Sequence, residues 1–124
     1  MIPISAENLQ ESLIKIERDV KHLDQKLSHK IMFIAEEIIT NIIRHGDFGT
    51  NEKQISFNLD IKNNILTFRD NAKKFNMLTH PDPDITLDIK ERVPGGLGIY
   101  LTKKYAKSIK YSYENGFNIL KVYI

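Results

Sequence analysis

The apolar residues between Ser28 and His45 recur around most of a helical circumference, and this pattern constrains the fold more than any other in the chain. They are Ile31, Met32, Phe33, Ile34, Ala35, Ile38, Ile39, Ile42 and Ile43. A helix that is apolar on nearly all sides must be covered on several of them by other elements. The segment therefore predicts a central helix, which we expect to end at Gly46 because glycine commonly follows the last helical turn.

Two further helices are predicted around this central one. Apolar residues follow the three–four spacing of a single helix face through residues 7–27, and Ser5 is placed to cap the N-terminus of that helix. We expect this helix to break within residues 24–28. A short helix is expected over residues 98–107, directly after a cluster of glycines.

Two β-hairpins complete the predicted architecture. Apolar and polar residues alternate over residues 55–61, and a turn at 62–64 leads to a second strand over 65–69. Residues 109–124 contain another hairpin around Asn115-Gly116, which is the strongest short-range signal for a tight turn. Hairpins covered by helices predict an α+β two-layer sandwich, with a mixed, mainly antiparallel sheet and three helices on one face.

The bulk composition narrows the classes of function. A chain of 124 residues is expected to form one domain, residues 1–124. A net charge of +2, without clustered lysines, argues against direct binding of nucleic acid, and the absence of cysteine excludes disulfides and thiolate metal sites. No apolar run approaches the roughly 20 residues of a membrane span, and no signal peptide is evident, so we expect a cytoplasmic protein without membrane contact.

Polar residues within the central helix suggest a functional site. Glu37, Asn41 and His45 are spaced four apart and share one side of the helix, whereas Glu36 points about 100° away and is expected to be solvated. Such a row predicts a hard-cation and phosphate edge, with Asn41 offering an oxygen to Mg²⁺, Glu37 as general base and Arg44 near phosphate. The alternative is a polar seam that is merely hydrogen-bonded beneath the sheet.

Two other segments complete this hypothesis. Asp70 ends a strand, where its carboxylate could accept a hydrogen bond from an adenine amino group; the alternative is an ordinary turn or capping residue. Gly95, Gly96 and Gly98 precede a helix and permit close approach of backbone N–H groups to an anion, although they could equally form a tight turn. The order and spacing of the three segments favour an ATP site that lacks a Walker loop.

Between the hairpins, residues 73–94 have no sustained periodicity and contain three of the four prolines. A loop of this length inside a compact domain is usually a functional lid or a disordered segment. The sequence therefore predicts an ATP lid at about residues 73–94.

These motifs resemble those of the GHKL superfamily of ATPases and kinases, which has the Bergerat ATP-binding fold. Glu37-x-x-x-Asn41 with His45-Gly46 resembles the N box, Asp70-x-Ala72-x-x-Phe75 the first glycine box, and Gly95-Gly96-Leu97-Gly98 the second. The hairpin over residues 111–121 also resembles the closing hairpin of these proteins. Within the superfamily, the chain is most similar to bacterial anti-sigma-factor serine-protein kinases.

The resemblance implies roles for individual residues. Glu37 would be the catalytic base and Asn41 the Mg²⁺ ligand, while Asp70 would bind adenine. Residues of the three boxes would surround the ATP; besides those already named they are Arg44, His45, Ala72, Phe75, Gly95, Gly96, Leu97 and Gly98. Arg92 would stand in for an arginine that usually meets the γ-phosphate, because Pro94 occupies the nearest position.

The resemblance also implies a reaction and partners. The γ-phosphoryl group of ATP would pass to a serine of an anti-anti-sigma protein with a STAS domain, and a sigma factor would compete for the same protein. Ala72 replaces the glycine expected there, and the displacement of Arg92 bears on phosphoryl transfer more than on ATP binding. A nucleotide-gated binding module without kinase activity is therefore the alternative. Apolar area on the first helix or at a sheet edge would permit a homodimer, and the first edge strand would be short, about residues 2–5.

Overall fold

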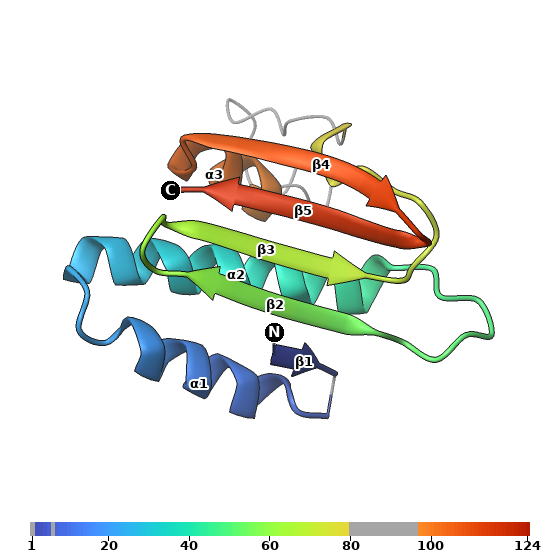
Figure 1. The fold of residues 1–124 in the computed structure, drawn as a ribbon, viewed down its shortest axis with the longest axis horizontal. Helices are drawn as coiled ribbons and strands as arrows, with labels where there is room; N and C mark the ends of the chain where they lie inside the picture. The colour runs from blue at the N-terminus through green and yellow to red at the C-terminus, as the bar shows by residue number, and fades with distance from the viewer. Residues whose placement is uncertain (1, 6, 80–96) are drawn as a thin grey trace, which may run out of the picture.

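The computed structural model of the protein describes residues 2–5, 7–79 and 97–124. The elements follow in the order β1 (Ile2–Ile4), α1 (Leu9–Val20), α2 (Gln25–His45), β2 (Ile55–Asp60), β3 (Ile65–Asp70), the 3₁₀ helix η1 (Met77–Thr79), α3 (Leu97–Tyr105), β4 (Ser108–Glu114) and β5 (Phe117–Tyr123). Figure 1 shows the strands as one layer and the helices as a second layer on a single face. The α+β two-layer sandwich is confirmed.

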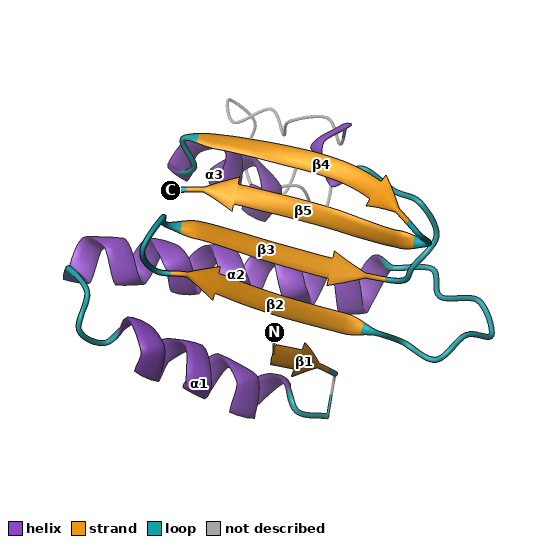
Figure 2. Cartoon of the chain, viewed as in Figure 1, coloured by secondary structure: helices purple, strands orange, loops and turns teal. Residues whose placement is uncertain are grey.

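The sheet has five strands in the order β1-β2-β3-β5-β4. Each of the four strand pairs in the described residues is antiparallel, in keeping with the expected mainly antiparallel sheet. Both predicted hairpins are present, and Figure 2 shows their strands joined by short turns. The φ angles of Asn115 and Gly116 are 52° and 83°, as a tight two-residue hairpin turn requires.

Helix α2 forms the centre of the helical layer. It begins three residues earlier than predicted, because the side chain of Asp24 caps it by accepting a hydrogen bond from the Leu27 N–H at 3.3 Å. It ends at the predicted Gly46, whose φ of −64° is open to any residue. Glycine is needed there for space, since a Cβ would lie only 2.6 Å from the carbonyl oxygen of Ile42.

Helix α1 is shorter than the sequence predicts. It begins after Asn8, and the prediction that Ser5 is its N-cap is wrong. The Ser5 N–H instead donates to Asn8 Oδ1 at 2.6 Å, and the Asn8 N–H donates to Ser5 Oγ at 3.3 Å, so the two residues close a turn ahead of the helix. The helix ends at Val20, earlier than predicted, while Asp24, which lies within the predicted break at residues 24–28, has the extended backbone that precedes α2.

The core lies between α2 and the inner face of the sheet. Phe57 and Phe68 are directly opposite each other on β2 and β3, with ring centroids 5.1 Å apart, and both are fully buried. From α2 the core takes Ile31, Ile34, Ala35, Ile38, Ile39 and Ile42. These residues account for the apolar circumference seen in the sequence. In the described part of the chain, helices of the length and apolarity that a bilayer crossing requires are absent.

A side-chain bridge fixes the C-terminal end of α2 beside the end of β3. Asn71 donates from Nδ2 to the Glu52 carbonyl at 2.8 Å and accepts from the Gln54 N–H at 2.8 Å. The Lys73 N–H also donates to the Asp47 carbonyl at 2.7 Å. These bonds tie the loop that follows α2 to the segment that follows β3, and so bring together two of the predicted motifs.

Candidate functional site

Two buried polar residues face the helical layer at one end of the sheet. Asp70 and Asn118 are paired directly across β3 and β5, and they are 7% and 6% exposed. Both lie on the inner face, which alternation otherwise fills with the apolar residues Leu66, Phe68 and Leu120. A buried polar pair on an apolar face must be hydrogen-bonded to be tolerated.

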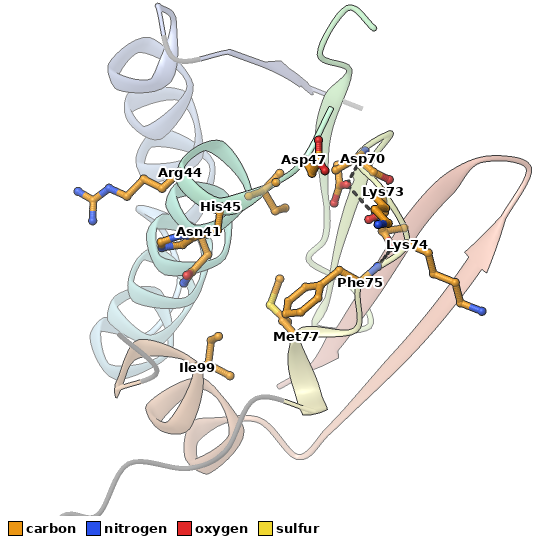
Figure 3. Close-up of a pocket in the computed structure, with 14 residues that line it drawn as sticks. Asn41, Arg44, His45, Asp47, Asp70, Lys73, Lys74, Phe75, Met77 and Ile99 are labelled. Carbon is orange, nitrogen blue, oxygen red and sulfur yellow. Dashed lines mark hydrogen bonds between the residues drawn. The ribbon is translucent and has the colours of Figure 1, made fainter. Parts of the chain in front are cut away.

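The Asp70 carboxylate receives its hydrogen bonds on one oxygen. The Ala72 N–H and Asn118 Nδ2 both donate to Oδ1, each at 3.0 Å, and Figure 3 shows bonds of this network as dashed lines. The described residues donate no hydrogen bond to Oδ2. Asp70 therefore has one oxygen held by the protein and one acceptor that remains for a ligand in the adjoining cavity.

Asn118 connects this carboxylate to the segment that follows β3. Its Nδ2 also lies 3.1 Å from the Ala72 carbonyl and 3.2 Å from the Lys73 carbonyl, while its Oδ1 accepts from the Phe75 N–H at 3.0 Å and from the Tyr111 hydroxyl at 2.5 Å. Each polar atom of the amide is therefore used. The start of the predicted lid is fixed to β5 by this one side chain.

Burial changes the acidity of Asp70. Removal of the carboxyl group from water raises its pKa above the usual range for aspartate, and the hydrogen bonds from Asn118 and Ala72 only partly oppose this effect. The ionised form is thus less favourable here than in water. A ligand that donates a hydrogen bond to Oδ2 would compensate for part of that penalty.

A cavity of about 690 Å³ opens between α2 and this end of the sheet. Its lining residues are Asn41, Ile42, Arg44, His45, Gly46, Asp47, Asp70, Ala72, Lys73, Lys74, Phe75, Met77, Ile99 and Asn118. The size falls within the range of sites for small molecules and cofactors. Six residues that the sequence predicts for nucleotide binding lie on this lining: Asn41, Arg44, His45, Asp70, Ala72 and Phe75.

The two walls of the cavity carry different side-chain groups. Figure 3 shows Asn41 on the α2 wall, Asp70 and Phe75 on the opposite wall, and the Arg44 side chain extending away from both. Asn41 Nδ2 donates to the Glu37 carbonyl at 3.0 Å, which leaves its Oδ1 as an acceptor toward the cavity. Phe75 lines the cavity and is 59% exposed.

Glu37 is not among the residues that line the cavity; its carboxylate packs against the first turn of α3. A Cβ added at Gly98 would overlap the Glu37 carboxylate and lie 2.6 Å from its Cδ. Position 98 therefore has no room for a side chain. The structure brings together Glu37 and Gly98, which are separated by sixty-one positions in the sequence.

Ala72 stands where a glycine is expected in the first glycine box. The structure accommodates it without strain. It is 5% exposed and is not among the described residues with positive φ. Glu36, by contrast with Glu37, is exposed as predicted. Arg92, Gly95 and Gly96, with most of the predicted lid, lie outside the described residues, and Leu97 is the first residue of α3.

Comparison with known protein families identifies the family of this chain. The sequence matches the family described as the histidine kinase-like ATPase domain over residues 3–124, which is nearly its whole length. The chain belongs to this family. A search of curated proteins finds no significant match. Membership in the histidine kinase-like ATPase family makes this an ATP-binding, kinase-like domain of the GHKL type.

The described residues of this ATPase domain can hold Mg²⁺ only together with a bound ligand that supplies further oxygen donors. Within the described ranges there is no group of three or more His, Asp or Glu side chains placed to hold a metal ion. Asn41 Oδ1 is a hard oxygen donor at the cavity wall, and Mg²⁺ is commonly held by one or two protein oxygens together with phosphates and water. The site therefore fits magnesium that arrives with a nucleotide.

Asn118 is the residue that sequence reasoning missed in this ATPase domain. Alternation over residues 117–123 places Asn118 on the same face as Leu120 and Val122, so a polar residue in the core face was visible in the sequence. What the pattern could not provide is its partner, since Asp70 lies forty-eight positions away. Asp47, Lys73, Lys74 and Met77 line the cavity as well and have no comparable signal.

We expect Asn118→Ala to lower the free energy of unfolding by about 2–3 kcal/mol, because it leaves the Phe75 N–H, the Tyr111 hydroxyl and Asp70 without their buried partner. Urea denaturation followed by circular dichroism measures this change. Asn58→Ala, which removes an exposed asparagine of β2, is the matched control and should alter stability by less than about 0.5 kcal/mol. Equal stability of the two variants would contradict the role of Asn118.

Proposed function

We propose that this domain is a serine-protein kinase and anti-sigma factor, which transfers the γ-phosphoryl group of ATP to a serine of an anti-anti-sigma protein with a STAS domain. The observation that carries the proposal is the contact between the Glu37 carboxylate and Gly98. It puts a potential general base at the N-terminus of α3, where backbone N–H groups favour phosphate.

Binding of ATP is assigned to the cavity between α2 and the sheet. Asp70 Oδ2 would accept a hydrogen bond from the adenine amino group, since Oδ1 is already held by Ala72 and Asn118. Asn41 would contribute its Oδ1 to Mg²⁺, whose charge would neutralise phosphate oxygens. The cavity of about 690 Å³ has Asp70 on one wall and Asn41 on the other, so one nucleotide would lie across it with the base at the sheet and the phosphates toward α3.

In the transfer step, Glu37 would accept the proton of the substrate serine hydroxyl. The serine oxygen forms a bond to the γ-phosphorus as the bond between this phosphorus and the bridging oxygen breaks, and ADP is released. The phosphoserine carries about two negative charges, which is enough to weaken a complementary interface. Release of the phosphorylated STAS protein would then leave the kinase available to a sigma factor, its second proposed partner.

Incubation with Mg-ATP and a serine-bearing STAS-domain protein from the same source tests this function. We expect one phosphoserine per STAS protein, detected by mass spectrometry. A serine-to-alanine variant of the STAS protein is the control and should remain unmodified. Tight binding of ATP with no phosphoserine would refute the kinase and favour the alternative below.

The alternative function is a nucleotide-gated module that holds its partner without modifying it. The sequence feature in its favour is the displaced arginine, because Pro94 occupies the position nearest to the glycines and Arg92 lies two residues further upstream. Such a module would still use Asp70 and Asn41 to bind ATP. It would have no use for a base at Glu37, so the behaviour of that residue separates the two functions.

A further inference from the structure

The side-chain amide of Asn118 is held in one orientation by the groups around it. Its Nδ2 faces three oxygen atoms at 3.0–3.2 Å: Asp70 Oδ1, the Ala72 carbonyl and the Lys73 carbonyl. Its Oδ1 accepts from the Phe75 N–H at 3.0 Å and from the Tyr111 hydroxyl at 2.5 Å. A reversed amide would place its oxygen against three oxygens and its NH₂ against the Phe75 N–H. Asn118 therefore acts only as a donor toward Asp70.

This orientation decides which oxygen of Asp70 can carry a proton. Oδ1 receives two N–H groups, from Ala72 and from Asn118, each at 3.0 Å. These two donors use both lone pairs of Oδ1, so a proton that binds the carboxyl group has only Oδ2 open to it. Since Asp70 lines the cavity and no described residue donates to Oδ2, the protonated carboxyl group directs its O–H toward the cavity.

Burial and hydrogen bonds, rather than neighbouring charges, control this protonation. Six titratable or charged side chains lie around Asp70 on the elements packed against it: Arg44 and His45 at the end of α2, Asp47 in the next loop, Lys73 and Lys74 after β3, and Tyr111 on β4. The first five are exposed, so water and salt screen their charges. Burial raises the pKa of the Tyr111 phenol, which stays neutral and donates to Asn118. Burial also raises the pKa of Asp70, and the hydrogen bonds from Asn118 and Ala72 partly oppose this effect.

The two forms of Asp70 offer opposite hydrogen-bond partners to a purine. The ionised carboxylate presents only an acceptor at Oδ2, which suits the 6-amino group of adenine. The protonated carboxyl group presents a donor there, which suits the 6-oxo group of hypoxanthine and opposes an amino group. A mismatch leaves a buried polar group unpaired, and such mismatches discriminate strongly between related ligands.

We propose that Asn118 is a positioning residue for base recognition, which confines the Asp70 proton to the oxygen that faces the ligand. Ionised Asp70 then selects a 6-amino purine, and protonated Asp70 selects a 6-oxo purine. This assignment rests on the proposed binding of adenine at Asp70, and it adds a second class of ligand, the 6-oxo purine nucleotides, to the same cavity.

Asp70→Asn tests the base preference without a change of pH. Its amide oxygen must accept from the Ala72 N–H and Asn118 Nδ2, so its NH₂ group takes the place of the Oδ2–H donor. Isothermal titration calorimetry with Mg-ADP and with the magnesium complex of inosine diphosphate (IDP) measures the preference. We expect the wild type to prefer ADP at neutral pH and Asp70→Asn to prefer IDP, so that the affinity ratio changes by about 100-fold or more.

A control ligand and the separate affinities distinguish the possible results. Purine riboside diphosphate carries only hydrogen at position 6, so the wild type and Asp70→Asn should bind it with affinities within about threefold of each other. A loss of ADP affinity in Asp70→Asn with no gain of IDP affinity would overturn the preference proposed here and leave adenine binding at Asp70 intact. Unchanged affinity for both nucleotides would overturn both proposals.

The pH dependence of the same ratio tests the role of Asn118. In the wild type the ratio of ADP to IDP affinity should fall by up to about tenfold per pH unit as pH falls through the raised pKa of Asp70. ADP and IDP carry the same phosphates, so this ratio is independent of phosphate titration. Loss of the Asn118 hydrogen bond raises the pKa of Asp70 further, so Asn118→Leu should have a lower ratio than the wild type at the same mildly acidic pH.

A second variant guards against a loss of folding in Asn118→Leu. Asn118→Asp keeps the shape of the side chain but replaces the donor toward Asp70 by an oxygen, so it should also lower the ratio. Tyr111→Phe leaves Asn118 Nδ2 in place to donate to Asp70 and is the control, with a ratio close to that of the wild type. A wild-type ratio in a folded Asn118→Leu or Asn118→Asp protein would overturn the positioning role of Asn118.

Discussion

Asp70→Asn is expected to reduce the affinity for Mg-ADP by about 100-fold or more. The Ala72 N–H and Asn118 Nδ2 both donate to one side-chain atom, so an asparagine must place its oxygen there. Its NH₂ group would then face the cavity, where it opposes the adenine amino group instead of accepting from it. A donor that faces a donor costs about 3 kcal/mol in a buried site. Isothermal titration calorimetry measures the loss.

Asp60→Asn is the matched control for this prediction. Asp60 accepts hydrogen bonds from Asn63 at the turn between β2 and β3, far from the cavity. We expect Asp60→Asn to bind ADP as the wild type does, and neither protein to bind Mg-GDP at comparable concentrations. Undiminished ADP affinity in Asp70→Asn would exclude Asp70 from the nucleotide site.

Asp70→Asn should not lower the free energy of unfolding at neutral pH. The pKa of Asp70 is raised in the folded state by burial, so the folded protein holds its proton more tightly than the unfolded chain. The contribution of Asp70 to stability is thus greatest below the ordinary aspartate pKa and declines as pH rises through the raised value. Asp70→Asn keeps an oxygen that accepts from both the Ala72 N–H and Asn118 Nδ2. Because asparagine does not titrate, the stability of this variant does not decline with pH in this way. Its melting temperature at pH 7 should equal or exceed that of the wild type.

Glu37→Gln is expected to retain ATP binding and to slow phosphoryl transfer by about 10²–10⁴-fold, as loss of a general base does. Glutamine has nearly the shape of glutamate, so it preserves the packing against Gly98 that a smaller residue would disturb. Single-turnover measurements with the STAS substrate separate transfer from binding. Transfer at the wild-type rate would remove Glu37 from the chemistry.

Glu36→Gln provides the control for Glu37→Gln. Glu36 is adjacent in sequence and has the same charge, but it is exposed and points to a different side of α2. We expect Glu36→Gln to transfer the phosphoryl group at the wild-type rate. Equal slowing in both variants would indicate a loss of net charge rather than the loss of a base.

Local patterns predicted the elements of the fold well. The Asn115-Gly116 turn, the alternation over residues 55–61 and the apolar circumference of α2 each depend on residues close together in the sequence. Helix ends were predicted less well, because they depend on which of several capping residues is used. At α1 both Ser5 and Asn8 could act as caps, and their hydrogen bonds to each other decide the outcome.

The site could be predicted only as separate motifs. Sequence spacing put Asn41 and Glu37 on one side of α2 and marked Asp70 as the end of a strand. It could not show that Asp70 is paired with Asn118, because that pairing depends on the register between β3 and β5. Nor could it show that Gly98 is required for the Glu37 carboxylate, since this contact joins two helices.

The position of β5 in the sheet has a consequence for how the protein is made. Strand β5 follows every other described element in the chain, yet it lies between β3 and β4. A ribosome therefore synthesises β4 before the strand with which it pairs, and Asp70 before Asn118. Until β5 has emerged, the nascent chain has neither a complete sheet nor the hydrogen bond from Asn118 that holds the Asp70 carboxylate. A ligand of the cavity can accordingly stabilise the folded domain only after β5 has been synthesised.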